Sequence, residues 1–264
     1  MPPGGTLGRI LEETRKRVTS LKRGLKASEP GPTATGPRLA PALRGPMVAV
    51  IAEIKRRSPS KGVLSESLDP ARQASAFADG GAVAVSVLTE PAFFGGSLGD
   101  LAAVRGAVSL PVLRKDFHID PAQLAEAHAA SATAVLLIAR ALPLELLKTL
   151  LDEAAGLGLE TVVEVRTEEE LARALACGAA IVGVNSRDLE TLEIDSRVPE
   201  RLMPLIPRTV VGIWESGVHD VESVCRAADC GADAVLVGSA LSRTADPESL
   251  VRALSRVPRK ERHG

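Results

Sequence analysis

Six ionisable residues stand at the ends of short apolar runs in this chain: Glu53, Lys55, Lys115, Glu164, Arg187 and Glu215. Carboxylates and lysines that lie together can exchange protons with a substrate, and lysine and arginine can hold its anionic groups. Buried charge is costly unless it is paired. If these side chains meet, they therefore form either a structural ion network or a site for a polar, anionic molecule.

Eight apolar runs predict the strands that would carry these residues. They cover residues 48–54, 82–88, 110–115, 134–139, 161–165, 180–185, 209–213 and 234–238. Intervening segments at 121–130, 143–155, 167–177 and 220–229 have the composition of helices. Apolar strands alternating with helices indicate a parallel sheet covered on its outer face. Eight such units predict a single-domain α/β fold, the (β/α)8 or TIM barrel. A doubly wound sheet is the alternative, but the nucleotide fingerprint expected of it is absent from the sequence.

The strand period places the charged residues at one end of such a barrel. Alternate strand residues point inward, and functional side chains come from the carboxyl ends of the strands. In the first strand Glu53 and Lys55 follow Ile51 at two-residue steps, and four later strands end in a charged residue at the same inward position. Small residues follow the last two strands, at Ser216-Gly217 and Gly238-Ser239. Barrels commonly bind phosphate at these two turns through backbone N–H groups.

The segments outside the barrel predict a cover and a linker. A helix over residues 6–24 would place its apolar residues on one stripe, formed by Leu7, Ile10, Leu11, Val18 and Leu21. Residues 29–46 are dense in proline and glycine, which disfavours a helix or a central strand. We therefore expect an N-terminal helical extension with its linker at 1–47, a catalytic barrel at 48–256 and a polar tail at 257–264.

Composition excludes several classes of function. The chain has 264 residues, with 32 Lys and Arg against 33 Asp and Glu, and only 2% of its residues are aromatic. A nucleic-acid binder needs a basic surface and often aromatic rings for stacking, so this composition argues against one. No apolar segment is long enough to span a membrane, and three scattered cysteines indicate a reducing compartment without a structural metal site. We expect a cytoplasmic protein that binds a small molecule and neither nucleic acid nor membrane.

Seven motifs resemble those of the indole-3-glycerol phosphate synthase family. They are IAEIKRRSPSKG (51–62), SVLTEPAFFGGS (86–97), LRKDFHID (113–120), VEV (163–165), VGVNSRDLETLEID (182–195), ESGV (215–218) and LVGSAL (236–241). They follow one another in the family's order. The resemblance implies a carboxy-lyase of tryptophan biosynthesis without metal or organic cofactor. It would convert 1-(2-carboxyphenylamino)-1-deoxyribulose 5-phosphate to indole-3-glycerol phosphate, carbon dioxide and water.

The resemblance also implies a role for each matching residue. Lys115 resembles the general acid that protonates the ketone oxygen of the substrate, and a pKa lowered toward neutrality would suit that task. Glu164 resembles the group that handles the proton of the dehydration step, while Glu53 is placed to exchange protons with the hydroxyls and ring nitrogen. Lys55 joins this catalytic set and also reaches the phosphate. The remaining matches are Ser58, Asn185 and Arg187 for the substrate carboxylate, Phe117 for its ring, Glu215 for its chain, and Ser216, Gly217, Gly238 and Ser239 for its phosphate.

Two other functions stay open at this point. A related barrel such as phosphoribosylanthranilate isomerase would use a Cys or Asp acid–base pair at strand ends, whereas Cys177 falls in a predicted helix and Asp116 on the outward alternation. A non-catalytic barrel subunit would be expected to lack one of the charges at the mouth, and none is missing. We further expect a monomer, with association with other tryptophan-pathway enzymes left open.

Aromatic residues give one more expectation. Phe93, Phe94, Phe117 and Trp214 all lie in or beside motifs of the predicted mouth. Trp214 precedes Glu215 where a small residue is typical of the family. We expect its ring to narrow the wall on the phosphate side of the mouth.

Overall fold

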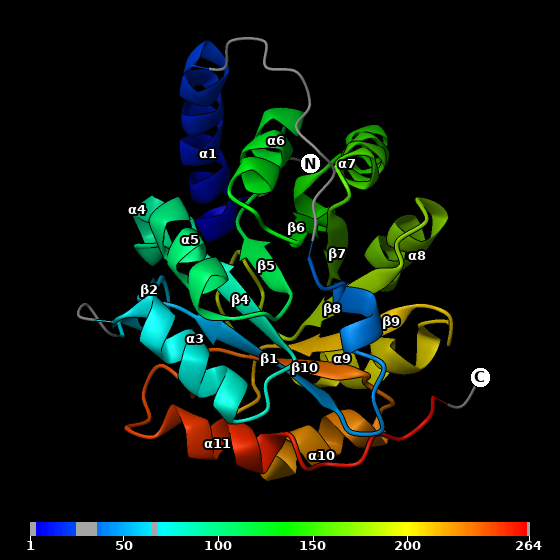
Figure 1. Cartoon of the computed structure of the whole chain (residues 1–264). Helices are drawn as coiled ribbons and strands as arrows, with labels where there is room; N and C mark the ends of the chain where they lie inside the picture. The colour runs from blue at the N-terminus through cyan, green and yellow to red at the C-terminus, as the bar shows by residue number, and fades with distance from the viewer. Residues whose placement is uncertain (1–3, 25–35, 65–67, 263–264) are drawn as a thin grey trace.

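A closed barrel of eight parallel strands occupies the centre of the computed structural model, which describes residues 4–24, 36–64 and 68–262 (Figure 1). The barrel strands are β1 (Ala49–Ile54), β4 (Ala84–Leu88), β5 (Val112–Lys115), β6 (Ala134–Ile138), β7 (Glu160–Val165), β8 (Ile181–Asn185), β9 (Val211–Glu215) and β10 (Ala234–Val237). They pair in chain order, and β1 closes the ring by pairing with β10. The predicted (β/α)8 barrel is confirmed.

Helices surround the barrel on its outer side (Figure 1). They are α3 (Pro70–Asp79), α5 (Leu98–Ala107), α6 (Pro121–Ala129), α7 (Leu144–Gly156), α8 (Glu168–Ala176), α9 (Arg197–Leu202), α10 (Val221–Asp229) and α11 (Pro247–Leu254). Shorter elements are the hairpin of β2 (Arg57–Ser58) and β3 (Gly62–Val63), α4 (Pro91–Phe94), and the 3-10 turns η1 (Ala139–Ala141) and η2 (Met203–Leu205). Three of the helices begin with an Asp-Pro step, at Asp69, Asp120 and Asp246. In each, the carboxylate accepts a backbone N–H of the first turn and proline presets the helical φ.

The predicted strands match the observed ones to within two residues at each end. The largest shift is in β9, which was predicted at 209–213 and runs from Val211 to Glu215. Its start is delayed because Val210 N donates to Pro207 O and closes a turn before the strand. Its end extends because Trp214 and Glu215 pair with β8. The four predicted helices agree to within one residue at each end.

Strand alternation divides the aliphatic residues into two cores. Ile51, Leu113 and Ile213 belong to the core inside the barrel, and their outward neighbours pack beneath the helices. Trp214 lies in the outer core with 3% of its surface exposed. The expectation that its ring narrows the mouth is therefore wrong, because adjacent strand residues face opposite sides of the sheet.

The two N-terminal helices lie at opposite ends of the barrel. Helix α1 (Gly5–Gly24) packs beside α6, and its Ile10 reaches the pocket at the carboxyl ends of the strands (Figure 1). Helix α2 (Leu39–Ala42) sits at the start of β7, where the Glu160 carboxylate accepts the N–H groups of Leu39 and Ala40. Leu39 is fully buried. Residues 29–35 of the predicted linker lie outside the described residues.

The last described residues pack against the amino-terminal end of the barrel. Val48 N donates to Val257 O, and the side chains of Arg259 and Arg262 both pair with the buried Asp233. Arg262 is 6% exposed. The tail therefore contributes one buried, paired charge, and positions 263–264 lie outside the described residues.

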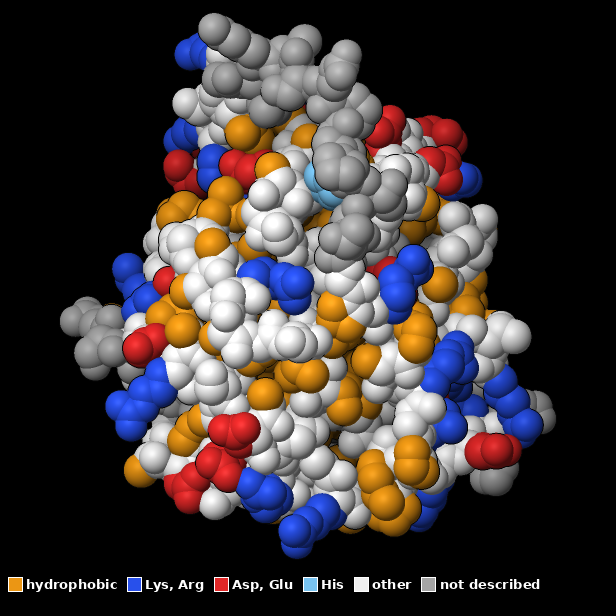
Figure 2. All heavy atoms as spheres, viewed as in Figure 1, with side chains coloured by type: hydrophobic (Ala, Val, Ile, Leu, Met, Phe, Trp, Pro, Cys, Tyr) orange, Lys and Arg blue, Asp and Glu red, His pale blue; other side chains and the backbone are white. Residues whose placement is uncertain are grey.

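The outer surface mixes both signs of charge. Figure 2 shows acidic and basic side chains interspersed over this face rather than gathered by sign. Across the described ranges, no helix is long and apolar enough to cross a membrane.

Candidate active site

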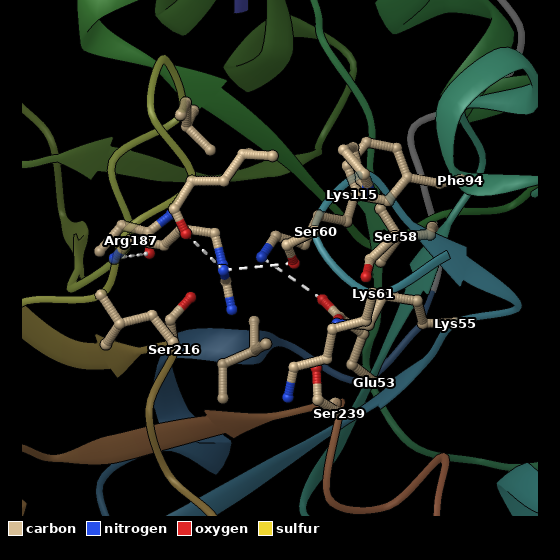
Figure 3. A pocket seen from close by; sticks show the side chains of 18 of the residues that line it. Glu53, Lys55, Ser58, Ser60, Lys61, Phe94, Lys115, Arg187, Ser216 and Ser239 are labelled. Carbon is tan, nitrogen blue, oxygen red and sulfur yellow. Dashed lines mark hydrogen bonds and ion pairs between the residues drawn. The ribbon is translucent and has the colours of Figure 1, made fainter. Parts of the chain in front are cut away.

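A pocket of about 610 Å³ opens at the carboxyl ends of the barrel strands. Twelve of the thirteen predicted site residues line it: Glu53, Lys55, Ser58, Lys115, Phe117, Glu164, Asn185, Arg187, Ser216, Gly217, Gly238 and Ser239. Figure 3 shows Glu53, Lys55 and Lys115 on one side of the pocket and Arg187 with Ser216 on the other. The thirteenth residue, Glu215, is fully buried beneath this lining.

Two lysines and two glutamates form a connected ion network at the bottom of the pocket. Lys55 Nζ lies 2.7 Å from Glu53 Oε1, and Lys115 Nζ lies 3.4 Å from Glu53 Oε2. Lys115 Nζ also donates to Glu215 Oε2 at 3.0 Å. Glu215 was expected to orient the substrate chain, but in this arrangement its carboxylate contacts Lys115 and is not part of the pocket wall.

The network shifts the acidity of its members. Burial opposes ionisation of Glu53, but Lys55 and Lys115 outweigh it and hold the pKa of this carboxyl below its ordinary value. Burial likewise favours neutral Lys115, yet the neighbouring carboxylates, led by Glu215, raise the pKa of its ammonium group. The expectation of a lowered Lys115 pKa is wrong for the ligand-free site, because three carboxylates from other strands surround this one amine.

The pKa of Glu164 is shifted in the opposite direction to that of Glu53. Burial, reinforced by the nearby charge of Glu215, raises the pKa of Glu164 to about 8, although Lys115 and a hydrogen bond with Asn185 act against the rise. A carboxyl that titrates near neutrality can both take and give a proton at the pH of the cell. The two glutamates are thus separated into an ionised and a largely protonated group.

Two glycines make room for this network. A Cβ atom at Gly238 would stand 2.2 Å from Glu53 Oε1, and one at Gly183 would stand 2.0 Å from Glu215 Oε1. Gly183 was not singled out from the sequence, although a glycine inside the apolar strand β8 signals a close approach by another group. Gly238 therefore does more than border the phosphate side, since a Cβ atom there would displace the Glu53 carboxylate and the Lys55 amine.

Arg187 holds the opposite wall of the pocket. Its guanidinium donates to Ser60 Oγ at 3.3 Å and to Leu192 O at 2.8 Å, and its backbone N–H donates to Asn185 Oδ1 at 2.9 Å. Burial lowers the pKa of Arg187, and the attraction of Glu53 opposes that change. Since arginine stays charged in spite of such a shift, this wall presents a cation to the pocket.

Two further cations border the pocket, and the sequence reasoning did not assign them. Lys61 lies in the β2–β3 hairpin and Arg243 lies just beyond the LVGSAL motif. Burial first, and then the repulsion of Arg243, Arg187 and Lys55, lowers the pKa of Lys61. The mutual repulsion means that the pocket carries excess positive charge and favours an anionic ligand. Lys61 was visible as the cation of a polar turn, whereas Arg243 had no signal other than its proximity to the last strand.

The turn after β9 has an unusual backbone. Ser216 and Gly217 both have positive φ, 64° and 80°. Glycine adopts this conformation freely, but a serine there is strained, and such strain concentrates at ligand-binding sites. With Gly238 and Ser239 this turn forms the side of the pocket predicted to bind phosphate.

An apolar wall completes the pocket. The rings of Phe94 and Phe117 lie 6.1 Å apart at 35°, and Ile10, Leu136 and Ile138 also line the cavity. Phe93 packs against the inner core instead, so two of the four expected aromatics line the pocket. This wall can take a flat hydrophobic group between the two cationic sides.

Fold and site together define a class of protein. A parallel barrel with paired acids and bases, cationic walls and a small-residue turn at its carboxyl end is an enzyme site for a small anionic molecule. Within the described ranges no group of three or more His, Cys, Asp or Glu side chains could hold a metal ion.

Comparison with known proteins identifies the family. The family model described as "Indole-3-glycerol phosphate synthase" matches residues 8–254. A relative of that name from Mycobacteroides abscessus is 53% identical over 213 residues, 81% of this chain and 78% of the relative. Another, from Mycobacterium avium, is 47% identical over 258 residues, 96% of this chain and 95% of the relative. The chain belongs to the indole-3-glycerol phosphate synthase family and is a carboxy-lyase of tryptophan biosynthesis.

A solved structure with low sequence identity shows the same architecture. Thiamine phosphate pyrophosphorylase from Pyrococcus furiosus superimposes with a TM-score of 0.60 at 16% identity, covering 80% of this chain and 95% of that one. At this identity the likeness concerns the barrel fold alone.

The residues that an isomerase of this fold would use are not free to form an acid–base pair, although Asp116 borders the pocket. Cys177 caps the end of α8 and packs against the outer core, and the Asp116 carboxylate is engaged by Arg17, Thr89 and Arg114. All six charges expected at the mouth are present, so nothing in the site favours a non-catalytic subunit. The family match supports the synthase over both alternatives.

Proposed function

We propose how the side chains of this pocket divide the work of the family's reaction. The substrate is 1-(2-carboxyphenylamino)-1-deoxyribulose 5-phosphate, and the products are indole-3-glycerol phosphate, carbon dioxide and water. A bond forms between the ring carbon that bears the carboxylate and the ketone carbon. The carboxylate leaves as carbon dioxide, and the former ketone oxygen leaves as water to complete the indole ring. The enzyme must therefore hold two anionic groups apart and move protons between them.

The cations and small-residue turns around the pocket would hold the two charged ends of the substrate. Arg187, with Asn185 and Ser58, binds the carboxylate, and a guanidinium offers the paired donors that suit this group. Lys55 and the small-residue turns at Ser216-Gly217 and Gly238-Ser239 bind the phosphate. Phe117 packs on the aromatic ring. This arrangement brings the ring carbon and the ketone carbon toward each other over the ion network, which is how positioning accelerates such a step.

Lys115 would supply the proton to the ketone oxygen. Its ammonium group lines the pocket and rests on Glu53 and Glu215, so it is protonated before the substrate arrives. Its raised pKa makes it a weak acid in the empty site. Ring closure places negative charge on the ketone oxygen, and this oxyanion is basic enough to take the proton from the amine.

Glu164 would handle the proton of the dehydration step. Its pKa of about 8 lets the carboxyl exist in either form near neutral pH, as a group that gives and takes a proton in one cycle requires. Glu53 stays ionised, stabilises Lys115 and Lys55, and is placed to accept hydrogen bonds from the substrate hydroxyls and ring nitrogen. Glu215 acts through Lys115 by fixing the position of its ammonium group.

The observation that carries this proposal is the burial of Lys115 among carboxylates on the floor of a cationic pocket. Lys115→Arg keeps the positive charge but removes an accessible proton, because the guanidinium does not deprotonate in proteins. We expect product formation to fall at least about 10²-fold, the scale of a lost general acid, with little change in substrate affinity. Lys148→Arg, on the exposed face of α7, is the matched control and should match the wild type. Near-wild-type turnover of Lys115→Arg would show that another group donates the proton.

We also propose the setting in which this chain works. It acts as a cytoplasmic monomer, alone or beside other enzymes of tryptophan biosynthesis, and binds neither nucleic acid nor membrane. Residues 1–47 serve as an extension of the catalytic barrel at 48–256, and 257–264 as its tail. Activity that persists in the presence of a chelator would support a reaction without metal, and light scattering of the purified protein would test the monomer.

A further inference from the structure

Asp116 directly follows the proposed acid Lys115, and its carboxylate accepts four hydrogen bonds. It is 1% exposed. Oδ1 accepts from Arg17 of α1 at 2.5 Å and from Phe117 N at 2.8 Å. Oδ2 accepts from Thr89 Oγ1 at 2.7 Å and from Arg114 at 3.2 Å. One buried carboxylate thus joins the N-terminal helix to the segment that carries both Lys115 and Phe117.

The rest of that segment is held just as tightly. Gln123 Nε2 donates to Phe117 O at 3.0 Å, and Gln123 Oε1 accepts Ile119 N at 2.8 Å. Both backbone polar groups of Phe117 are therefore bonded to side chains, one of them to Asp116. The ring of Phe117 forms part of the aromatic wall of the pocket. The backbone just before it, at the end of β5, determines the position of the Lys115 amine.

Among the donors to Asp116, Arg17 is the one that comes from the N-terminal helix α1 and not from the barrel. Arg114, the other cation on Asp116, is shared with Glu126, to which it donates at 2.6 Å. Without Arg17 the buried Asp116 charge would keep this divided cation and the neutral donors Thr89 and Phe117 N–H, and burial of an undercompensated charge is costly. The carboxylate would then turn toward water and release the Phe117 N–H.

We propose that Arg17 is a positioning residue for the reaction, and that it acts through Asp116 to hold Phe117 and Lys115 in register with the aromatic end of the substrate. The inference rests on the roles proposed above for Phe117 and Lys115. It assigns to α1 a specific electrostatic contribution in addition to the apolar cover provided by Leu7, Ile10 and Leu11. The phosphate-binding turns follow β9 and β10, on other strands than Lys115 and Phe117.

A second ion pair between the same two segments provides a matched control. Lys22 of α1 pairs with Asp120, at the other end of the Phe117 segment, at 2.5 Å. The Lys22 side chain is 56% exposed, against 29% for Arg17, and the Asp120 side chain is 18% exposed, whereas that of Asp116 is fully buried. Lys22→Ala therefore loosens the attachment of α1 without disturbing the carboxylate beneath Phe117.

The experiment compares Arg17→Ala, Arg17→Lys and Lys22→Ala in the full-length protein. For Arg17→Ala we expect kcat/KM to fall about tenfold or more, up to the roughly 10²-fold that a misplacement of about 1 Å can cost. Affinity for anthranilate, a probe of the aromatic end, should weaken, while affinity for glycerol 3-phosphate should stay within about twofold of the wild type. Arg17→Lys should recover part of the loss, and Lys22→Ala should leave both probes and kcat/KM unchanged.

Three results would overturn the proposal. They are wild-type kinetics for Arg17→Ala, equal effects of Arg17→Ala and Lys22→Ala, and equal weakening of both probes, which would indicate general loosening of the fold. If Arg17→Ala does not fold, Thr89→Val removes another donor to Asp116 with little change of shape and should give the same pattern at smaller amplitude. Loss of activity in Lys115→Arg together with wild-type behaviour of Arg17→Ala would reject the role of Arg17 alone, whereas an active Lys115→Arg would reject the proposed acid itself.

Discussion

Glu164 and Glu53 are two buried carboxylates of one pocket that should respond to substitution with opposite signs. Glu53 is flanked by Lys55 and Lys115, and its pKa is lowered. For Glu164, burial and then the charge of Glu215 raise the pKa from 4.5 to about 8. We predict that Glu164→Gln stabilises the ligand-free protein at neutral pH while it lowers turnover, because an amide keeps the shape of the protonated carboxyl but cannot transfer its proton.

The size of the effect follows from proton linkage. Below about pH 4.5 the Glu164 carboxyl is protonated in both the folded and the unfolded chain, and its contribution to stability is fully present. As the pH rises, the unfolded chain ionises first, so the wild type loses about 1.4 kcal/mol per pH unit until the folded carboxyl ionises near pH 8. At pH 7 the gap between variant and wild type is on the order of 3 kcal/mol. That corresponds to about 6–12 °C in Tm for a domain of this size.

Thermal unfolding of the wild type, Glu164→Gln and Glu53→Gln at pH 5, 7 and 8 measures this gap. Glu53→Gln is the matched control with the reverse sign. A lowered folded pKa gives stability that is present above the unfolded pKa, so removal of this charge should lower Tm at pH 7. A gap between Glu164→Gln and the wild type that does not widen from pH 5 to pH 7 would refute the assignment of a raised pKa to Glu164.

Three further outcomes are expected. Arg262→Ala should destabilise the protein by about 3 kcal/mol in urea unfolding, at the lower end for a broken buried ion pair because Arg259 still pairs with Asp233. Its kcat should not change, since the pair lies at the end of the barrel away from the pocket, and an unchanged unfolding midpoint would contradict the estimate. Arg187→Ala should raise KM much more than it lowers kcat in steady-state assays, and a fall in kcat alone would argue against carboxylate binding. Fluorescence of Trp214 should change little when the product saturates the enzyme, because the indole lies in the outer core, and strong quenching would place it nearer the ligand.

Much of the barrel could be predicted because the signals for its strands and helices lie in short stretches of sequence. A strand alternates every residue, so the order Ile51, Glu53, Lys55 already indicates which side chains face inward. Local signals also mark helix starts in this chain, since Asp120 and Asp246 each precede a proline and cap the helix that follows, although the helix after Asp246 was not predicted. Such signals need no knowledge of distant contacts, which is why the predicted ends were close.

Local patterns fail where neighbours in sequence are not neighbours in space. Trp214 is next to Glu215 in the chain, but the pleat of β9 sends the two side chains to opposite faces. In α1, Glu13 and Arg17 have the i,i+4 spacing of a helical ion pair, but Arg17 binds Asp116, 99 residues away. A buried carboxylate attracts a cation more strongly than an exposed one, because water screens the latter.

The sequence by itself determined the fold class, the inward direction of the charged strand residues, and twelve of the residues that line the pocket. These features depend on local patterns and on motifs that any member of the family would carry. The tertiary structure decided the acidity of Lys115 and Glu164, the close approach of carboxylates to Gly183 and Gly238, and the attachment of α1 through Arg17. Each of these depends on charges or atoms brought together from different strands, and only closure of the barrel sets those distances.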